Sequence, residues 1–475
     1  MQEKIISIGI DIGTSTTQLV FSELLIDNVA NDYSVPRLTI VDKKIIYKSE
    51  IIFTPLLSKD EIDVEKIKDF VGSQYSLAHI NIDDVKTGAV IITGDTARKN
   101  NADKVLKILS SFAGDFVVAT AGPDLESLLS GLGANANELS KSYGKSIVNI
   151  DIGGGTSNIS YFKNGDLKGV ACLDIGGRLI KADSNSGKIT YVYKKIKELA
   201  KENGIDIEES ENIDVSKLKI IARLMTEILA ASLNLVNKPN IFNRMLTNNG
   251  KTISFEDDHS IEGITFSGGV GECIYHKKKE IFEYGDIGIL LAEAINESEE
   301  FRKIKRYVPK ETLRATVVGA GMYTTEITGS TILYDKEILP LKNIPILKIE
   351  DSEMDKIDYY LKQRIHLFNI ENKLDTIAVS FSGKGYTSFA SIQAIGEKVI
   401  LGMEDLIKKN LPIIIVLEED IAKAFGHTLR AKLKGKNIIC IDGIRTKMGD
   451  YIDIGLPIGG GQALPVVIKT LIFNT

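Results

Sequence analysis

Two stretches of the chain share one pattern of apolar and polar positions. Residues 5–23 read IISIGIDIGTSTTQLVFSE, and residues 146–164 read SIVNIDIGGGTSNISYFKN. Each runs through an apolar strand to Asp-Ile-Gly, passes a turn rich in small and hydroxyl residues, and continues as a second alternating strand. Because Gly permits a tight turn and a period of two is typical of strands, each stretch predicts a β-hairpin. The two copies, at Asp11 and Asp151, indicate a duplicated core with a cleft between its halves.

The remaining pattern alternates strands with helices. Buried strands are predicted at 87–95 and 114–122, and helices at 96–111 and 124–139, which together indicate an α/β fold. Further on, FSGGVGE (266–272) is expected to follow a strand and open a helix, and 315–332 to form another strand with glycines. TIAVSFSG, PIIIVLEED and NIICIDG are candidate strands of the last third. With Pro340 to Pro345 as punctuation, we expect three units: 1–145 and 146–340 as two lobes, and 341–475 as an additional α/β subdomain.

The composition is that of a globular protein and argues against nucleic-acid and membrane proteins. The 475 residues are 43% hydrophobic and 26% charged, with a net charge of -6, which is typical of a globular chain and argues against nucleic-acid binding. The cysteines, Cys172, Cys273 and Cys440, are far apart and predict buried free thiols. No apolar run approaches the length of about 20 residues that crosses a bilayer. We therefore expect a cytoplasmic protein that binds neither membrane nor nucleic acid.

The two turns carry the chemistry expected of a polyphosphate site. Backbone N–H groups of a glycine-rich turn converge on phosphate oxygens. The expected phosphate-binding residues are Gly13, Thr14, Ser15 and Thr16 in the first turn and Gly153, Gly154, Gly155 and Thr156 in the second. Carboxylates repel phosphate, so Asp11 and Asp151 are expected to hold Mg²⁺ instead. A single Asp-x-Gly turn is commonly a plain hairpin, but its repetition favours the functional interpretation.

Other candidates have two interpretations each. Gly268 and Gly269 would let the backbone lie flat against a base or ribose. Glu272 would accept hydrogen bonds from ribose hydroxyls or simply be an acid at a helix start, and Gly319 would line the same cleft or cap a strand. Asp124 and Glu126 are the best candidates for orienting an attacking water, although both would also suit a helix N-terminus.

These motifs resemble a known superfamily. Asp-Ile-Gly-Thr-Ser-Thr-Thr, Asp-Ile-Gly-Gly-Gly-Thr and Ser-Gly-Gly-Val-Gly-Glu occur in the order of the phosphate-1, phosphate-2 and adenosine motifs of the actin/Hsp70/sugar-kinase superfamily, over about residues 1–335. The resemblance implies a duplicated ATPase fold with two lobes around a nucleotide cleft. It implies ATP/ADP and Mg²⁺ as ligands, with Asp11 and Asp151 at the metal and Gly268 and Gly269 at adenosine.

A closer resemblance extends over nearly the whole chain. IGIDIGTSTTQLVFS, VATAGPDLESLLSGLGA, VNIDIGGGTSNISYF, LDIGGRLI and DIGLPIGGGQALPVVIKTLIF resemble the reactivating factors of ethanolamine ammonia-lyase, the EutA family. Such proteins are chaperone-like: they use ATP to release damaged cobalamin from an adenosylcobalamin-dependent lyase. The implied partner is that lyase, and the implied setting is ethanolamine utilisation. Asp95 stands where Glu is expected, and Gly122 precedes Pro123 where Hsp70-like proteins have Glu, so the residue that orients water stays open.

Alternative functions remain on the same fold. One is a small-molecule kinase, another an ATP-regulated scaffold or filament protein, and a more remote one a hydantoinase- or carboxylase-like enzyme. We expect a weak ATPase that forms a homo-oligomer, associates with an ethanolamine-utilisation microcompartment and does not itself bind cobalamin tightly.

Overall fold

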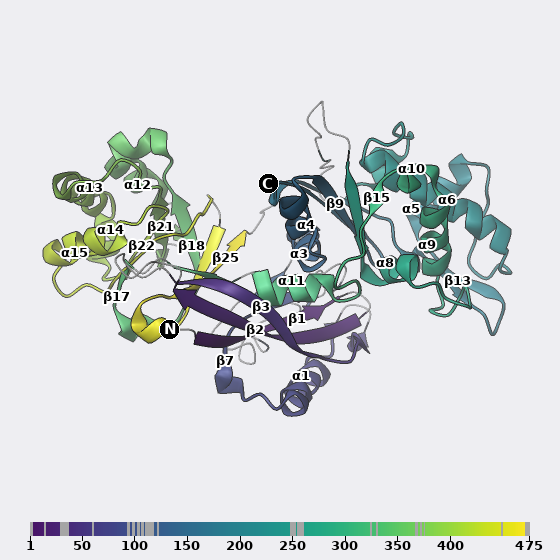
Figure 1. Cartoon of the computed structure of the whole chain (residues 1–475), viewed down its shortest axis with the longest axis horizontal. Helices are drawn as coiled ribbons and strands as arrows, with labels where there is room; N and C mark the ends of the chain where they lie inside the picture. Colours follow the sequence, from purple (N-terminus) through teal and green to yellow (C-terminus); the bar gives the residue numbers. More distant parts are fainter. Residues whose placement is uncertain are drawn as a thin grey trace.

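The computed structural model arranges the chain around three main sheets. It describes residues 3–13, 16–28, 38–58, 61–92, 96, 100–101, 105, 109, 118–120, 123–247, 253, 261–323, 325–328, 331–365, 369–370, 373–374, 376–447 and 450–470. Figure 1 shows the third sheet and its helices at one end, the helices of the second sheet at the other, and the first sheet between them.

The first sheet is built on the first predicted hairpin. Its strand order is β3-β2-β1-β7-β8, with β4 also beside β2; β1, β2 and β3 are antiparallel, whereas β7 and β8 run parallel to β1. The elements are β1 Glu3–Ile12, β2 Thr16–Asn28, β3 Leu38–Lys48, β4 Ile52–Phe53, β5 Leu56–Ser58, β6 Glu61–Ile62, α1 Val64–Ala78, β7 Val85–Ile92 and β8 Val118–Thr120. Helix α1 is capped by Asp63, whose side chain accepts from the Lys66 N–H. The apolar face of the helix packs on the sheet.

The second sheet repeats this arrangement. Its order is β11-β10-β9-β14-β15, again with three antiparallel strands followed by two parallel ones. The elements are α3 Pro123–Gly133, α4 Ala136–Tyr143, β9 Ser146–Ile152, β10 Ser157–Lys163, β11 Asp166–Leu173, β12 Ile180–Asp183, β13 Lys188–Val192, α5 Lys194–Glu202, α6 Val215–Ser232, α7 Phe242–Met245, β14 Gly263–Ser267, α8 Gly268–Tyr275, α9 Gly288–Glu297, α10 Glu299–Arg302 and β15 Lys305–Arg306. Both predicted hairpins and the duplicated core are thus confirmed.

Helices α3 and α11 (Ala315–Tyr323) pack against each other and join the two sheets. Helix α3 packs on β9 and β10, and α11 packs on β1 and β2. The expected strand at 315–332 is wrong over its first half, because 315–323 is helical. Its glycines permit close helix packing: a Cβ at Gly319 would lie 2.0 Å from the Leu129 carbonyl oxygen, and one at Gly133 1.8 Å from that of Ala315.

Other predicted elements differ in detail. The expected helix at 124–139 divides into α3 and α4, because Asn135 adopts a left-handed conformation with φ of 65°. The expected helix at 96–111 falls mostly outside the described residues. The strands expected at 87–95 and 114–122 are confirmed over their described residues, as β7 and β8, and the rest of both ranges lies outside the described residues. All three cysteines are buried and free, as expected.

The third sheet has the order β16-β25-β24-β18-β21-β22-β23-β17, and β18, β21, β22 and β23 are parallel. Its strands are β16 Thr325–Ile327, β17 Leu333–Tyr334, β18 Leu341–Lys348, β21 Ala378–Phe381, β22 Ile413–Leu417, β23 Ile438–Ile441, β24 Asp450–Ile454 and β25 Pro465–Thr470. The helices of this region are α12 Ile357–Ile365, α13 Phe389–Gly402, α14 Glu404–Lys408 and α15 Ala422–Lys432, and the short strands β19 Asn369–Ile370 and β20 Lys373–Leu374 pair with each other. The three candidate strands of the last third are confirmed as β21, β22 and β23. The division at 340/341 stays a prediction; β16 and β17 precede it and pair in this sheet.

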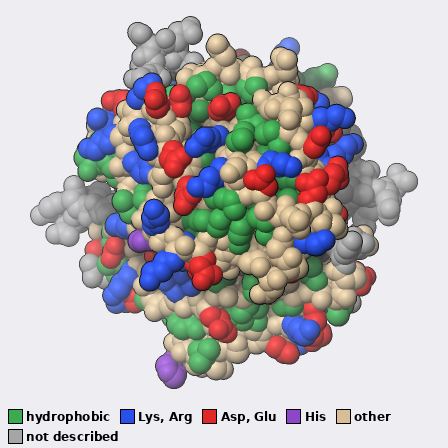
Figure 2. All heavy atoms as spheres, turned by 90° about the vertical axis from the view of Figure 1, so that its right-hand side faces the viewer, with side chains coloured by type: hydrophobic (Ala, Val, Ile, Leu, Met, Phe, Trp, Pro, Cys, Tyr) green, Lys and Arg blue, Asp and Glu red, His purple; other side chains and the backbone are tan. Residues whose placement is uncertain are grey.

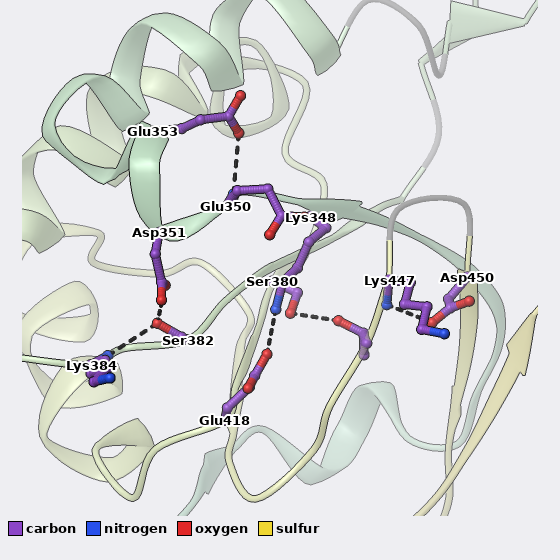
Figure 3. Close-up of polar contacts among 11 residues, drawn as sticks. Lys348, Glu350, Asp351, Glu353, Ser380, Ser382, Lys384, Glu418, Lys447 and Asp450 are labelled. Atoms are coloured by element: carbon purple, nitrogen blue, oxygen red, sulfur yellow. Dashed lines mark hydrogen bonds and ion pairs between the residues drawn. The ribbon is translucent and has the colours of Figure 1, made fainter. Parts of the chain in front are cut away.

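Polar side chains gather where the parallel strands of the third sheet end (Figure 3). Lys348 Nζ lies 2.6 Å from Glu418 Oε1, and the Thr446 hydroxyl donates to Ser380 Oγ over 2.7 Å. The Lys348 side chain is only 7% exposed, against 29% for Glu418. Lys348 and Glu418 form the ion pair drawn there, and Asp351, Glu353 and Asp450 accept hydrogen bonds from a hydroxyl or from backbone N–H groups. We therefore interpret this cluster as a structural one.

The surface carries charges of both signs. Figure 2 shows Lys and Arg interspersed with Asp and Glu on the end of the molecule formed by the helices of the second sheet. Ion pairs such as Arg223–Glu297 and Lys219–Glu293 link α6 to α9 there. Among the described residues, no helix is both long and apolar enough to span a bilayer.

Candidate functional site

The two turns are closed in the same way. The Gly13 N–H donates to the Thr16 carbonyl oxygen over 2.9 Å, and the Gly153 N–H donates to that of Thr156 over the same distance. Thr14 and Ser15 lie outside the described residues, as does Asp95. Equal closure of the two glycine turns, each between antiparallel strands, is the structural counterpart of the repeated sequence.

The two aspartates occupy equivalent positions. Asp11 pairs with Gln18 across the first hairpin, and Asp151 pairs with Asn158 across the second. Both aspartates are nearly buried, at 8% and 6% exposure. Burial raises the pKa of Asp151 to about 6, and a hydrogen bond from the Ser267 hydroxyl opposes this shift. When a carboxylate that is buried to this extent ionises, it needs a nearby cation to compensate for the lost hydration.

Glu126 joins the two aspartates from helix α3. Burial raises the pKa of Glu126 well above its usual value, and the negative charges of Asp151 and Asp11 raise it further, while a hydrogen bond from Asn158 acts in the opposite direction. Three carboxyl groups from separate elements therefore lie close enough for the charges of the two aspartates to disfavour ionisation of Glu126. Asp124 is the second residue of α3, and its side chain lies outside the described part of the chain. Of the two candidates for orienting water, Glu126 is the one that the structure brings to the aspartates.

Two residues that the sequence analysis overlooked lie beside these carboxylates. Gln18 and Asn158 are buried, at 4% and 1% exposure, and Gln18 Oε1 and Asn158 Oδ1 have no hydrogen-bond partner. Buried acceptors without a donor are uncommon in folded proteins. The signal was present in the sequence, because each amide stands at the same distance after its aspartate.

This donor set suits a hard cation that keeps part of its water shell. Carboxylate and amide oxygens are the ligands that Mg²⁺ prefers, and the waters of the ion could donate to the two orphaned amide oxygens. Within the described ranges, no three His, Cys, Asp or Glu side chains are grouped as an all-protein metal site would require. The residues present therefore fit Mg²⁺ held by few protein ligands together with water and phosphate.

The segment expected to contact adenosine has the predicted form. Strand β14 ends at Ser267 and α8 starts at Gly268, whose φ is 81°. A Cβ at Gly268 would lie 2.4 Å from the Ile152 carbonyl oxygen, whereas one at Gly269 would meet nothing within 4 Å. Only glycine fits at position 268, because the backbone there lies so close to the second turn. At Gly269 the space that a side chain would occupy is open.

Two other predicted residues have partners of their own. The Thr312 hydroxyl donates to Glu272 Oε2, so the expected contact of Glu272 with ribose stays a prediction. Gly319 lies inside α11 against α3, which gives it a packing role and excludes the strand-cap alternative, while its position on the cleft wall stays a prediction. The physical reason is that both α3 and α11 need a glycine where their backbones nearly touch.

The repeated sheet order, the paired turns and their aspartates define a duplicated α/β protein with the actin/Hsp70-like fold. The family model described as "Ethanolamine utilisation protein EutA" matches residues 3–474. The chain belongs to this family.

Curated relatives match over nearly their whole length. The chain is 35% identical over 473 residues to ethanolamine ammonia-lyase reactivase EutA of Escherichia coli (strain K12), covering 99% of both chains. It is 34% identical over 470 residues to the protein of the same description from Salmonella typhimurium, again with 99% of both chains covered.

Solved structures similar to this one cover about two thirds of the chain. A Ppx/GppA family member of Aquifex aeolicus matches with a TM-score of 0.39 and 15% identity, covering 67% of this chain and 97% of that one. EutJ of Carboxydothermus hydrogenoformans matches with a TM-score of 0.32 and 14% identity, covering 67% and 89%. The sheet order described above, rather than these alignments, carries the assignment of the fold.

Proposed function

We propose that this protein is an ATP-dependent reactivating factor that releases damaged cobalamin from ethanolamine ammonia-lyase, so that adenosylcobalamin can rebind. The observation that carries the proposal is the match to EutA over residues 3–474, together with the names of the two curated relatives. Its partner is then the adenosylcobalamin-dependent lyase, and its setting is the cytoplasm or an ethanolamine-utilisation microcompartment. Assembly into a homo-oligomer is part of the same proposal.

The two turns are the proposed nucleotide site. Gly13 and the residues Gly153 to Thr156 present backbone donors to the phosphates, and Gly269 leaves room for the adenosine. Asp11 and Asp151 would hold Mg²⁺ by their carboxylate oxygens, directly or through its waters. When bound, the ion offsets the negative charge of the phosphates and of the three carboxyl groups.

Glu126 is the proposed acceptor that orients the attacking water. That role requires an ionised carboxylate, which burial and the two aspartates oppose. A cation near Asp11 and Asp151 would favour ionisation of Glu126, so that the water is oriented only in the loaded site. We therefore expect ATP hydrolysis to be weak without Mg²⁺.

Coupling to the lyase follows from the position of the site. A nucleotide held by both turns contacts both sheets, and the loss of its terminal phosphate removes contacts that keep them together. Such a change can act on the lyase only if the two forms of the protein differ in affinity for it. The α3–α11 contact, where the two sheets are joined, is the element through which the movement would pass.

A rescue assay tests the proposal. Lyase inactivated with cyanocobalamin is mixed with adenosylcobalamin, Mg²⁺, ATP and this protein or its Asp11→Ala, Asp151→Ala and Asp206→Ala variants. Asp206 is exposed and away from the turns, so its variant is the matched control. We expect ethanolamine deamination to return with the unchanged protein and the control, and to stay absent without ATP or with either site variant. No recovery with the unchanged protein would overturn the reactivase proposal, and ADP formation stimulated by a small hydroxylated substrate would favour a kinase instead.

A further inference from the structure

Arg178 is fixed by its main chain to the second turn. Its N–H donates to the Gly154 carbonyl oxygen over 2.7 Å, and the N–H of the preceding Gly177 donates to that of Gly153 over 3.0 Å. A Cβ at Gly176 would lie 2.4 Å from the Gly154 oxygen, so glycine there is what permits this close approach. The Arg178 side chain therefore starts next to backbone that is proposed to cradle phosphate.

The guanidinium of Arg178 reaches across to the first sheet. Its Cζ lies 5.7 Å from the centre of the Phe53 ring. Phe53 is on β4 and pairs with Thr16, and the neighbouring Thr54 hydroxyl donates to the Gly13 carbonyl oxygen over 2.7 Å. One side chain thus links a segment bound to the second turn with a segment bound to the first.

The present partners of this guanidinium leave most of its donors available. Arg178 Nε lies 3.5 Å from Asp286 Oδ2, which is longer than a good hydrogen bond. Asp286 is itself anchored, because its Oδ1 accepts from the Gly288 N–H over 2.8 Å. No second carboxylate approaches Arg178 among the residues that the structure describes. Since an arginine has five N–H donors in a fork that matches phosphate, the group is equipped for an additional anion.

The contact with Phe53 is also easily exchanged. Phe53 is 76% exposed, so its ring gains little from burial in this pair, and the Arg178 side chain, at 29% exposure, still reaches solvent. A large exposed aromatic ring beside a phosphate-binding turn has no packing reason of its own. The contact with the Arg178 guanidinium explains its position, because the face of the ring attracts the cation and leaves the N–H donors of the guanidinium free to bind another group.

We propose that Arg178 is a terminal-phosphate sensor that latches the two halves of the nucleotide site. With a triphosphate between the turns, its guanidinium donates to oxygens of the terminal phosphate and stays against Phe53. With a diphosphate, it returns to Asp286 and the link to the first sheet weakens. This inference rests on the proposed nucleotide site and adds to it a residue that distinguishes ATP from ADP.

A merely structural Arg178–Asp286 pair predicts a different result. Loss of such a pair would lower stability and would affect both nucleotides equally. A sensor discriminates between them, because only the triphosphate carries the group that it contacts.

The test measures the affinities of the full chain for ADP and for a non-hydrolysable ATP analogue, by calorimetry with Mg²⁺. The variants are Arg178→Gln, Arg178→Lys and Phe53→Leu, with Arg223→Gln as control, because Arg223 pairs with Glu297 on the far helices. For Arg178→Gln we expect affinity for the ATP analogue to fall about tenfold or more, as for loss of hydrogen bonds to a charged group, while ADP binding changes little. Arg178→Lys should recover only part of the loss, because lysine lacks the fork.

Hydrogen exchange supplies a second readout. The ATP analogue should protect the amides of residues 49–58 in the unchanged protein and protect them less in Arg178→Gln and Phe53→Leu. Equal loss of both nucleotides in Arg178→Gln, or an unchanged ratio of their affinities, would overturn the sensor and leave the nucleotide site standing. Absence of nucleotide binding by the unchanged protein would overturn the proposed site and the sensor together.

Discussion

The Ser267 hydroxyl donates a hydrogen bond of 2.6 Å to Asp151 Oδ1. It joins the last residue of β14 to the end of β9, where the two residues are register partners. Both side chains are buried. This hydrogen bond favours the ionised form of Asp151, whereas burial favours the neutral form.

Replacement of Ser267 by Ala should weaken Mg²⁺-dependent nucleotide binding in a pH-dependent way. Without the donor, the pKa of Asp151 rises further, so less of the site is ionised near neutral pH. We expect a loss of affinity of about tenfold at pH 7, the size of one hydrogen bond to a charged group, and a smaller loss at pH 8.5. Calorimetric titration across this pH range measures it.

Thr265→Val is the matched control for that experiment. Thr265 lies on the same strand, is equally buried, and donates to Asn149 Oδ1 instead of to the aspartate. The same pH dependence in both variants would show that loss of any buried hydroxyl on β14 is sufficient, and would contradict the role given to Ser267.

Replacement of Asp151 by Asn should stabilise the ligand-free protein at neutral pH. Its pKa is raised from 3.8 to about 6, so the folded protein binds the proton more tightly than the unfolded chain does. This favourable contribution is complete below about pH 4 and is lost as pH rises to about 6. We expect Asp151→Asn to remove part of that decline and to raise the free energy of unfolding at pH 7.5 by about 1 to 3 kcal/mol.

Urea unfolding between pH 4 and 7.5 measures this effect, with Asp206→Asn as the exposed control. Glu126 contributes in the same direction, so the decline should become smaller without vanishing. A variant that is less stable than the unchanged protein at pH 7.5 would contradict the prediction. The same variant should bind nucleotide poorly, because the charge of Asp151 that lowers the stability of the ligand-free protein is the charge that the proposed metal site needs.

Gly319→Ala should destabilise the junction of α3 with α11. The added Cβ would lie 2.0 Å from the Leu129 carbonyl oxygen, so one helix must move. We expect the free energy of unfolding to fall by about 1 to 3 kcal/mol, as for overpacking. Gly396→Ala in α13 is the control: its Cβ would lie 3.1 Å from a Thr428 methyl and 3.9 Å from the Phe425 ring, both of them side-chain atoms that can shift, and the change should be smaller in thermal unfolding. Equal effects of the two substitutions would argue against a tight helix contact.

The Lys348–Glu418 pair should respond unequally to loss of its two partners. Glu418→Leu leaves a lysine that is only 7% exposed, whereas Lys348→Met leaves a glutamate that is 29% exposed and closer to water. We expect a cost of roughly 3 kcal/mol for the first substitution, less for the second, and a partial recovery in the double variant. Urea unfolding of the three variants measures this, and equal costs for the two single substitutions would contradict the assigned burial.

The sequence predicts much of the proposed nucleotide site because the signals of its turns are local. Asp11 and Asp151, their glycine turns and the strand-to-helix turn at Gly268 each lie within a few residues of the apolar pattern that frames them. Gln18 and Asn158 carried a readable signal as well, since each follows its aspartate at the same spacing, and it was overlooked.

The segment 315–323 shows where local signals fail. Its valines and glycines favour a strand by propensity, yet it forms α11. The glycines are suited to close contact with α3 and β1, and that packing outweighs a weak local preference. The alternative role of Gly319 as a strand cap is wrong for the same reason.

The sequence by itself thus determined the two hairpins, the aspartate turns and the family, because strand alternation and turn chemistry act between near neighbours. Only the tertiary structure decided that Glu126 joins the two aspartates, that Gly319 belongs to a helix contact, and that Arg178 faces Phe53. Those relationships connect residues far apart along the chain. Burial and charge act through space, so their partners are known only once the sheets are packed together.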